Sequence, residues 1–139
     1  MRLLLDTRAL LWFVGGSDEL SITARRLIED TNNQRFSSVA SLGEMAIKVS
    51  LGKLKLAMSF VDFVQREVRG NAIELLAVSL DHLDELAKLL FHNRDLFDRM
   101  IVAQGLAESI PIISRDEAFE RYPVNVVWQD DRSLDEDDQ

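Results

Sequence analysis

Five short apolar runs, separated by stretches with helical periodicity, limit the folds open to this chain more than any other feature of its sequence. Each run is short enough for a buried strand and is followed by polar or charged residues, as parallel strands are at a sheet edge. Alternating units of strand and helix pack as a mostly parallel sheet with helices on both faces. The sequence therefore predicts an α/β fold with strands at residues 2–6, 35–39, 72–78, 111–114 and 125–128.

The stretches between these runs carry apolar residues at the i, i+3, i+4, i+7 spacing of helices that face a core. A helix opened by Ser41 and closed by Gly52 is expected after the second strand, and another at residues 59–69. Residues 97–108 are apolar nearly all round. That pattern indicates a helix buried on more than one side.

A chain of 139 residues is long enough for one domain with its own core, and residues 1–129 are expected to form it. Residues 130–139 hold six acids against Arg132 and supply most of the net charge of −8. This acidic tail is expected to be solvated and disordered. The remaining residues are close to charge balance, so the net charge does not exclude a nucleic-acid partner.

The chain has no cysteine, which excludes disulfides, thiolate zinc sites and cysteine nucleophiles. The apolar N-terminal stretch is interrupted by Asp6 and Arg8 and is too short to span a membrane. We expect a cytoplasmic protein that has no membrane partner.

Four acids stand at the predicted strand ends and helix starts: Asp6, Glu44, Asp98 and Asp116. In a parallel sheet the strand-to-helix connections gather at one edge, so these side chains can meet there. Carboxylates that meet cannot all stay ionised without cations. Oxygen ligands without a His or Cys partner favour a hard metal such as Mg²⁺ or Mn²⁺.

Helix capping is the alternative explanation for three of these acids. Ser41-x-x-Glu44 has the form of a capping box, Asp98 falls in a first helical turn, and Asp95 and Asp116 are candidate N-caps. Asp6 follows three leucines, and capping explains it only if a helix starts at once. Asp6 is therefore the strongest candidate for a functional carboxylate.

Hydroxyl and basic residues flank the four acids. Thr7 and Ser114 could orient a metal ligand or a water, or serve in ordinary turn capping. The arginines could contact phosphates or form surface ion pairs. The arginines within four positions of a proposed ligand are Arg8, Arg94, Arg99 and Arg115.

Three further side chains are assigned to ordinary structural roles. Lys48 is one helical turn after Glu44 and is expected to pair with it. His82 and His92 have no second ligand at zinc spacing, and we expect both to be exposed to solvent. The spacing of Trp12 predicts that it lies mostly in the core, although such aromatic residues can also line a groove for a partner.

Four segments together resemble the PIN-domain family, and most of all its VapC-type toxins, the ribonucleases of bacterial type II toxin–antitoxin pairs. The segments are LLLDTRALLW (3–12), SVASLGEMAIKVSLGKL (38–54), NRDLFDRMIVAQG (93–105) and IISRDEAFERY (112–122). The resemblance runs from residue 2 to about residue 128. It departs from the VapC pattern at Arg8, Gly43 and Leu96, where relatives usually have His, Trp and Pro, and these differences concern substrate preference and pocket shape.

This resemblance implies a PIN-like three-layer sandwich, with a central five-stranded parallel sheet flanked by helices. It further implies that Asp6, Glu44, Asp98 and Asp116 surround one or two Mg²⁺ or Mn²⁺ ions, with Asp95 beside them. The implied activity is an endoribonuclease that hydrolyses RNA phosphodiester bonds. The implied protein partners are a cognate antitoxin and a second copy of the chain.

Receiver domains and phosphatases also place an acid after the first strand, but receivers require paired acids there and a Lys late in the sheet, and neither appears. Haloacid-dehalogenase-type hydrolases require Asp-x-Asp there, and this chain has Asp6-Thr7-Arg8. A non-catalytic PIN-like module that binds RNA or protein remains the alternative to the nuclease.

Overall fold

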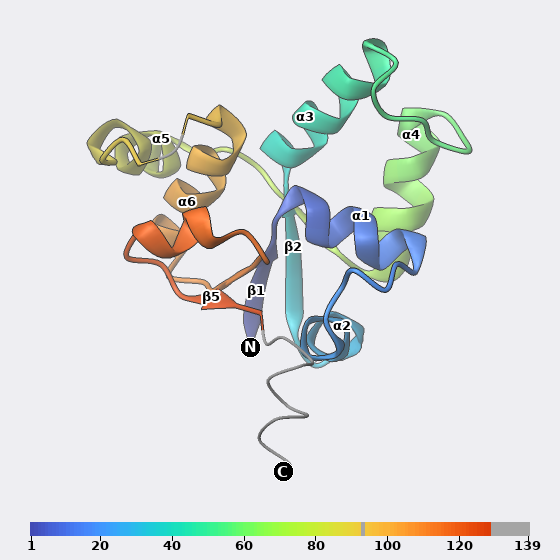
Figure 1. Ribbon diagram of the computed structural model, residues 1–139, viewed down its shortest axis with the longest axis horizontal. Helices are drawn as coiled ribbons and strands as arrows, with labels where there is room; N and C mark the ends of the chain where they lie inside the picture. The colour runs from blue at the N-terminus through green and yellow to red at the C-terminus, as the bar shows by residue number, and fades with distance from the viewer. Residues whose placement is uncertain (93, 129–139) are drawn as a thin grey trace.

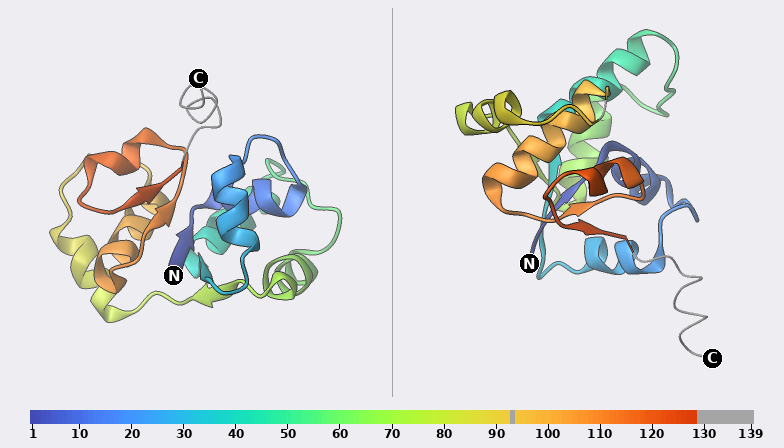
Figure 2. Two further views of the ribbon diagram at one scale, coloured as in Figure 1. Left: turned by 90° about the horizontal axis from the view of Figure 1, so that it is seen from below. Right: turned by 60° about the vertical axis from the view of Figure 1, so that its left-hand side comes forward.

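A computed structural model describes residues 1–92 and 94–128, so the expected acidic tail lies outside the described residues. A five-stranded parallel sheet in the order β3-β2-β1-β4-β5 separates two layers of helices (Figures 1 and 2). The predicted α/β class and the five strands are therefore confirmed. The strands are β1 (Arg2–Leu5), β2 (Gln34–Ser38), β3 (Glu74–Leu76), β4 (Ile112–Ile113) and β5 (Val126–Val127).

The helices α1, α2 and α4 lie on one side of the sheet, and α5 and α6 lie on the other (Figures 1 and 2). Their bounds are α1 (Thr7–Gly15), α2 (Ile22–Glu29), α3 (Val39–Ser50), α4 (Phe60–Phe63), α5 (Leu80–Lys88) and α6 (Leu96–Glu108). Shorter helical segments are η1 (Val64–Val68), η2 (Arg69–Asn71) and η3 (Glu117–Arg121). Among the helices of the described residues, none has the length and apolar character that crossing a membrane requires.

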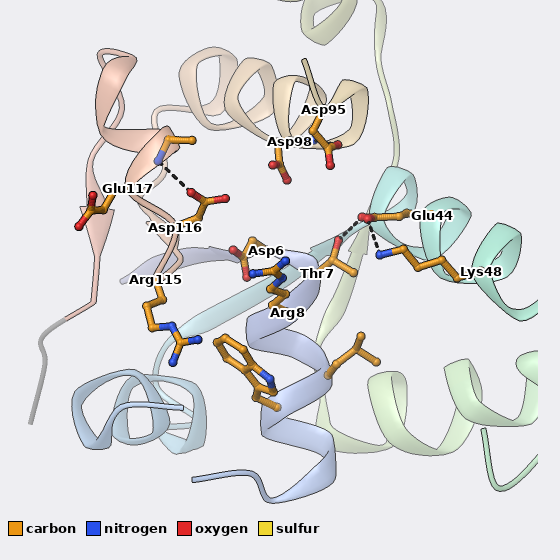
Figure 3. Close-up of a pocket in the computed structure, with 13 residues that line it drawn as sticks. Asp6, Thr7, Arg8, Glu44, Lys48, Asp95, Asp98, Arg115, Asp116 and Glu117 are labelled. Carbon is orange, nitrogen blue, oxygen red and sulfur yellow. Dashed lines mark hydrogen bonds and ion pairs between the residues drawn. The ribbon is translucent and has the colours of Figure 1, made fainter. Parts of the chain in front are cut away.

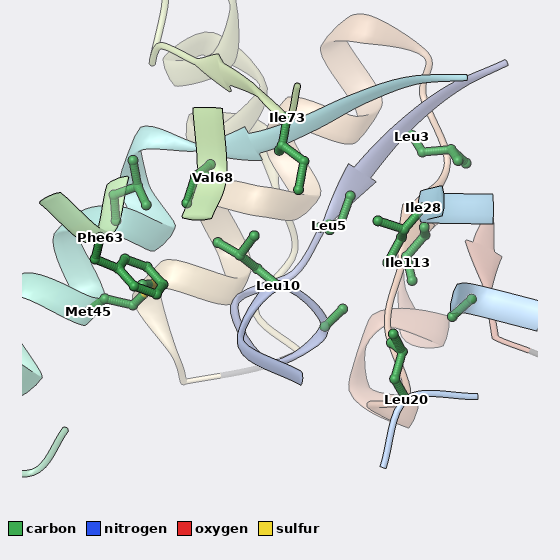
Figure 4. Packing of buried hydrophobic residues seen from close by; sticks show 13 residues of the cluster. Leu3, Leu5, Leu10, Leu20, Ile28, Met45, Phe63, Val68, Ile73 and Ile113 are labelled. Carbon is green, nitrogen blue, oxygen red and sulfur yellow. The ribbon is translucent and has the colours of Figure 1, made fainter. Parts of the chain in front are cut away.

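The three leucines of β1 explain why this strand lies at the centre of the sheet. Leu3 and Leu5 point into the core formed with α1, α2 and α3 (Figure 4). Leu4 points into the core on the α6 side. All three side chains are fully buried, and each such burial stabilises the fold by about 1.5–3 kcal/mol. A strand buried on both faces must therefore read as a continuous apolar run.

Helix α6 is buried on several sides, as its sequence predicted. Residues 101–105 are all buried. A Cβ at Gly105 would lie 3.1 Å from the Cδ1 atom of Ile112, so the glycine allows α6 to approach β4 closely. The approach brings the first turn of α6 to the edge of the sheet where β1 and β4 end.

The expected start of α3 is wrong by three residues, because its N-cap is Ser38 and not Ser41. The helix begins at Val39, because the Ser38 hydroxyl accepts a hydrogen bond from the Ala40 backbone N–H at 3.0 Å. Ser41 then lies inside the helix, where its hydroxyl is buried without a hydrogen-bond partner among the described residues. The capping-box explanation of Glu44 is therefore excluded.

The expected exposure of His82 is also wrong, since this side chain is only 1% exposed. The Ser79 backbone N–H donates to His82 Nδ1 at 3.0 Å, which leaves the proton on Nε2 to be donated to Glu108 Oε1 at 3.1 Å. The Ser79 hydroxyl accepts from the His82 backbone N–H and completes a capping box for α5. His82 thus joins the start of α5 to the end of α6.

We predict that His82→Ala lowers the free energy of unfolding by about 2–3 kcal/mol, because the Ser79 N–H and the Glu108 carboxylate lose their partner and the buried ring leaves a cavity. Urea denaturation followed by circular dichroism measures the change. Asp84→Ala is the control on the same helix, since it removes only an exposed ion pair with Lys88 and should leave stability nearly unchanged. Equal effects of the two substitutions would contradict the assigned role of His82.

Candidate active site

A pocket of about 640 Å³ opens at the ends of β1 and β4 (Figure 3). Helices α1 and α6 begin at this pocket, and α3 runs alongside it. The order of the sheet reverses between β1 and β4, and such a switch point is where α/β sheets bind ligands. All four predicted carboxylates line this one pocket, together with Asp95. The lining residues are Asp6, Thr7, Arg8, Leu11, Trp12, Glu44, Lys48, Asp95, Asp98, Arg115, Asp116, Glu117 and Ala118.

Asp6 is both a helix cap and a buried carboxylate. Helix α1 starts at once, and Asp6 Oδ1 accepts a hydrogen bond from the Ala9 backbone N–H at 2.7 Å. Capping thus accounts for one oxygen, but it does not require the side chain to be buried, and Asp6 is only 6% exposed. Burial raises the pKa of Asp6 to about 6, against the lowering effect of hydrogen bonds from Ser114 and Ala9. A cation beside Asp6 would therefore favour its charged form.

Ser114 connects Asp6 to Asp116. Its buried hydroxyl is hydrogen-bonded to the Asp6 carboxylate and accepts from the Asp116 backbone N–H at 3.0 Å. Asp116 caps η3 through a hydrogen bond from the Ala118 N–H at 2.9 Å, as its sequence position predicted. The negative charge of Asp116 contributes to the raised pKa of Asp6, which indicates that the two carboxylates lie close to each other.

Glu44 reaches the pocket from the second turn of α3. Its Oε1 accepts a hydrogen bond from the Thr7 hydroxyl at 2.8 Å, and its Oε2 lies 3.1 Å from Lys48 Nζ. The predicted pair with Lys48 is therefore present. Thr7 connects the residue after Asp6 to a carboxylate from a different element, so Asp6 and Glu44 are held in a defined relation.

Asp95 and Asp98 enter from the start of α6. Asp95 is the N-cap of this helix, since its Oδ1 accepts from the backbone N–H groups of Phe97 and Asp98 at 2.9 and 3.1 Å. Asp98 lies in the first turn and faces the pocket (Figure 3). In the same view the carboxylates of Asp6, Asp98 and Asp116 point toward one another, whereas that of Glu117 points away.

The basic residues near the site differ in where they lie. Arg8, Lys48 and Arg115 line the pocket, and the charge of Arg8 acts on Asp6 to lower its pKa against the effect of burial. Arg99, expected near the substrate, instead donates to the carbonyl groups of Leu90 and Leu89 and lies over the ring of Phe91. The structure therefore does not bring Arg99 into this pocket.

The sequence did not place every pocket residue, and Trp12 and Leu11 are examples. Trp12 was expected mostly in the core, but it is half-buried and forms part of the wall. Its position six residues after Asp6 was a usable signal, because Trp12 lies one turn beyond Arg8 on the same face of α1. Leu11 lines the pocket as well.

Six carboxylates and three basic side chains line the pocket, so its lining carries excess negative charge. Within the described residues, no three His, Cys, Asp or Glu side chains are close enough to hold a metal ion directly. Mg²⁺ keeps several of its waters and often uses only one or two carboxylates, which suits acids spread around a wall. The donor set, all oxygen, fits Mg²⁺ or Mn²⁺ and not zinc.

Comparison with known proteins gives a family and a fold. The profile of the family described as PIN domain matches residues 3–125. No curated protein matches the chain at a significant level. The structure of VapBC2 from Rickettsia felis bound to a DNA fragment from their promoter is similar, with a TM-score of 0.64 and 16% identity over 93% of this chain and 100% of that chain.

Two other solved structures have the same fold. FitAcB from Neisseria gonorrhoeae has a TM-score of 0.61 and 16% identity, and the match covers 89% of this chain and 95% of that chain. VapBC-1 from nontypeable Haemophilus influenzae has a TM-score of 0.61 and 16% identity over 94% of this chain and 98% of that chain. At such identities the similarity establishes the fold alone.

Proposed function

The chain belongs to the PIN-domain family, and we propose that it is a Mg²⁺- or Mn²⁺-dependent endoribonuclease, the toxin of a toxin–antitoxin pair. One observation supports the proposal above all others. Carboxylates from four separate segments of the chain line one pocket, at the switch point of the sheet, around the buried Asp6. A structural role for the four acids would not require them to meet.

In this proposal Asp6, Glu44, Asp98 and Asp116 hold the metal ions directly or through waters. Such ions, when bound, neutralise the charge that develops on a phosphodiester during hydrolysis. Ser114 orients Asp6 through its hydroxyl, and Thr7 orients Glu44. Lys48 balances the charge of Glu44, which leaves Arg8 as the basic residue best placed to contact a substrate phosphate.

The proposed partners follow from the family and from the solved neighbours. One of those neighbours is described as a toxin–antitoxin complex from Klebsiella pneumoniae, with a TM-score of 0.60 and 19% identity over 90% of this chain and 95% of that chain. We propose a cognate antitoxin, an RNA substrate in the cytoplasm and a homodimer for this chain. Co-expression with the product of an adjacent short reading frame, followed by sedimentation of the purified protein, tests both protein partners.

The function is tested by incubating the purified protein with total RNA in Mg²⁺, in Mn²⁺ and then in excess EDTA. The expected result is cleavage that depends on the metal ion and stops on chelation. Asp84→Asn is the matched control, because it changes an acid on α5 outside the pocket and should leave cleavage unchanged. RNA binding without metal-dependent cleavage would favour the non-catalytic module.

We predict that Thr7→Val lowers the rate of RNA cleavage about 10- to 100-fold, because Glu44 loses the hydroxyl that orients it. Thr7→Ser retains the hydroxyl and should keep most of the rate. Initial rates measured at saturating Mg²⁺ compare the two variants. A rate for Thr7→Val equal to that of the wild-type chain would show that the hydrogen bond has no part in catalysis.

A further inference from the structure

One wall of the pocket carries a stacked pair that the proposed metal chemistry does not use. The guanidinium carbon of Arg115 lies 4.6 Å from the centroid of the Trp12 ring. Glu19 Oε2 accepts from Arg115 Nη1 at 2.6 Å and fixes the guanidinium in this position. The ring of Trp128 lies 6.0 Å from that of Trp12, tilted by 56°.

These contacts leave an ordered aromatic and cationic surface at the pocket. Trp12 is half-buried, and the Arg115 side chain is 48% exposed, so both remain accessible from the pocket. Because Glu19 and Trp128 already restrain the pair, a ligand that stacks on it loses little additional side-chain freedom.

The position of the pair relative to Asp6 sets what could bind there. Arg115 directly precedes Asp116, and Trp12 lies six residues after Asp6 on the same helix, on the order of 9 Å along its axis. This separation is comparable with the distance from a phosphate to the base of its own or a neighbouring nucleotide. Indole rings and guanidinium groups are among the side chains on which proteins stack unpaired bases.

We propose that Trp12 and Arg115 form a stacking subsite for one unpaired base of the RNA substrate, next to the phosphate that is cleaved. The inference rests on the proposed function, because it takes RNA as the ligand of the pocket. A paired base is already stacked in its duplex and does not fit this role. The subsite therefore makes the protein select single-stranded segments of RNA.

The test uses the fact that the chain has two tryptophans. In an Asp6→Asn/Trp128→Phe protein, Trp12 is the sole indole reporter and bound RNA stays intact. Three probes of equal length are titrated: an oligoadenylate, a ribose-phosphate chain without bases, and a duplex. The oligoadenylate is expected to quench the fluorescence of Trp12 and to bind about 10- to 100-fold more tightly than the chain without bases.

Substitutions in the subsite distinguish stacking from charge. In the Asp6→Asn background, Trp12→Leu should weaken oligoadenylate binding at least tenfold and leave binding of the chain without bases unchanged. Arg115→Gln gives a second test. It changes an exposed side chain, so its result does not depend on whether the core tolerates the substitution. Equal affinity for probes with and without bases would overturn the proposal.

Failure of this inference and failure of the proposed function give different results. Metal-dependent cleavage by the wild-type chain together with base-independent binding overturns the stacking subsite and leaves the nuclease intact. Base-dependent quenching without any metal-dependent cleavage overturns the nuclease and supports the subsite as part of an RNA-binding module.

Discussion

Asp6→Asn is expected to lower the rate of RNA cleavage at least a thousandfold while the protein remains folded. Asn can still accept the hydrogen bond from the Ala9 N–H, so the cap of α1 is retained. The amide carries no charge, so the buried position loses the group that would hold a cation, and metal-ion catalysis contributes several kcal/mol to such reactions. Cleavage of a labelled RNA in Mg²⁺ measures the loss.

Two observations make this result interpretable. Circular dichroism should show the same helical content for the variant and the wild-type chain, and Asp84→Asn should cleave RNA at the wild-type rate. An Asp6→Asn protein that retains more than a tenth of the rate would show that Asp6 is a helix cap and nothing more.

The second large effect is on the pH dependence of stability in the absence of divalent cations. The pKa of Asp6 rises from 3.8 to about 6 on folding, chiefly because the carboxylate is buried. Between these values the native state holds a proton that the unfolded chain has released, so stability falls as the pH rises. The contribution of Asp6 is fully present below pH 3.8 and lost above about pH 6, and it is on the order of 3 kcal/mol.

Urea denaturation of the wild-type chain and of Asp6→Asn at several pH values between 4 and 7 isolates the contribution of Asp6 to stability. The free energy of unfolding of the variant should rise relative to that of the wild-type chain as the pH rises, because Asn has no proton to lose. Mg²⁺ should restore part of the wild-type stability above pH 6, where the carboxylate is ionised, and have little effect near pH 4. A difference between the two proteins that does not change with pH would contradict the burial of an ionisable Asp6.

Much of the fold could be predicted from the sequence, because buried parallel strands and helices leave different periods in the pattern of apolar residues. The three leucines of β1 had to be buried on both faces, and the structure buries them so. The start of α3 could not be predicted in this way. Ser38 and Ser41 are both good N-caps, and only the end of β2 decides between them.

The candidate site shows the same division. Asp6, Asp98 and Asp116 follow strands or open helices, so sheet topology brings them to one edge. Glu44 was expected there as a residue at the start of its helix, but it lies in the second turn. The direction of a side chain could not be predicted from the pattern of apolar and polar residues. His82 turns inward to Glu108, and Arg99 turns away from the pocket.

Binding of Mn²⁺ to the protein without RNA tests the central claim most directly, because it asks whether the four carboxylates form a metal site. Isothermal titration calorimetry at pH 7 should detect Mn²⁺ binding to the wild-type chain and to Asp84→Asn. Asp6→Asn and Asp116→Asn should each weaken it at least tenfold. Equal Mn²⁺ affinity of the wild-type chain and Asp6→Asn, or no binding to either, would contradict the assignment of this pocket as the catalytic metal site.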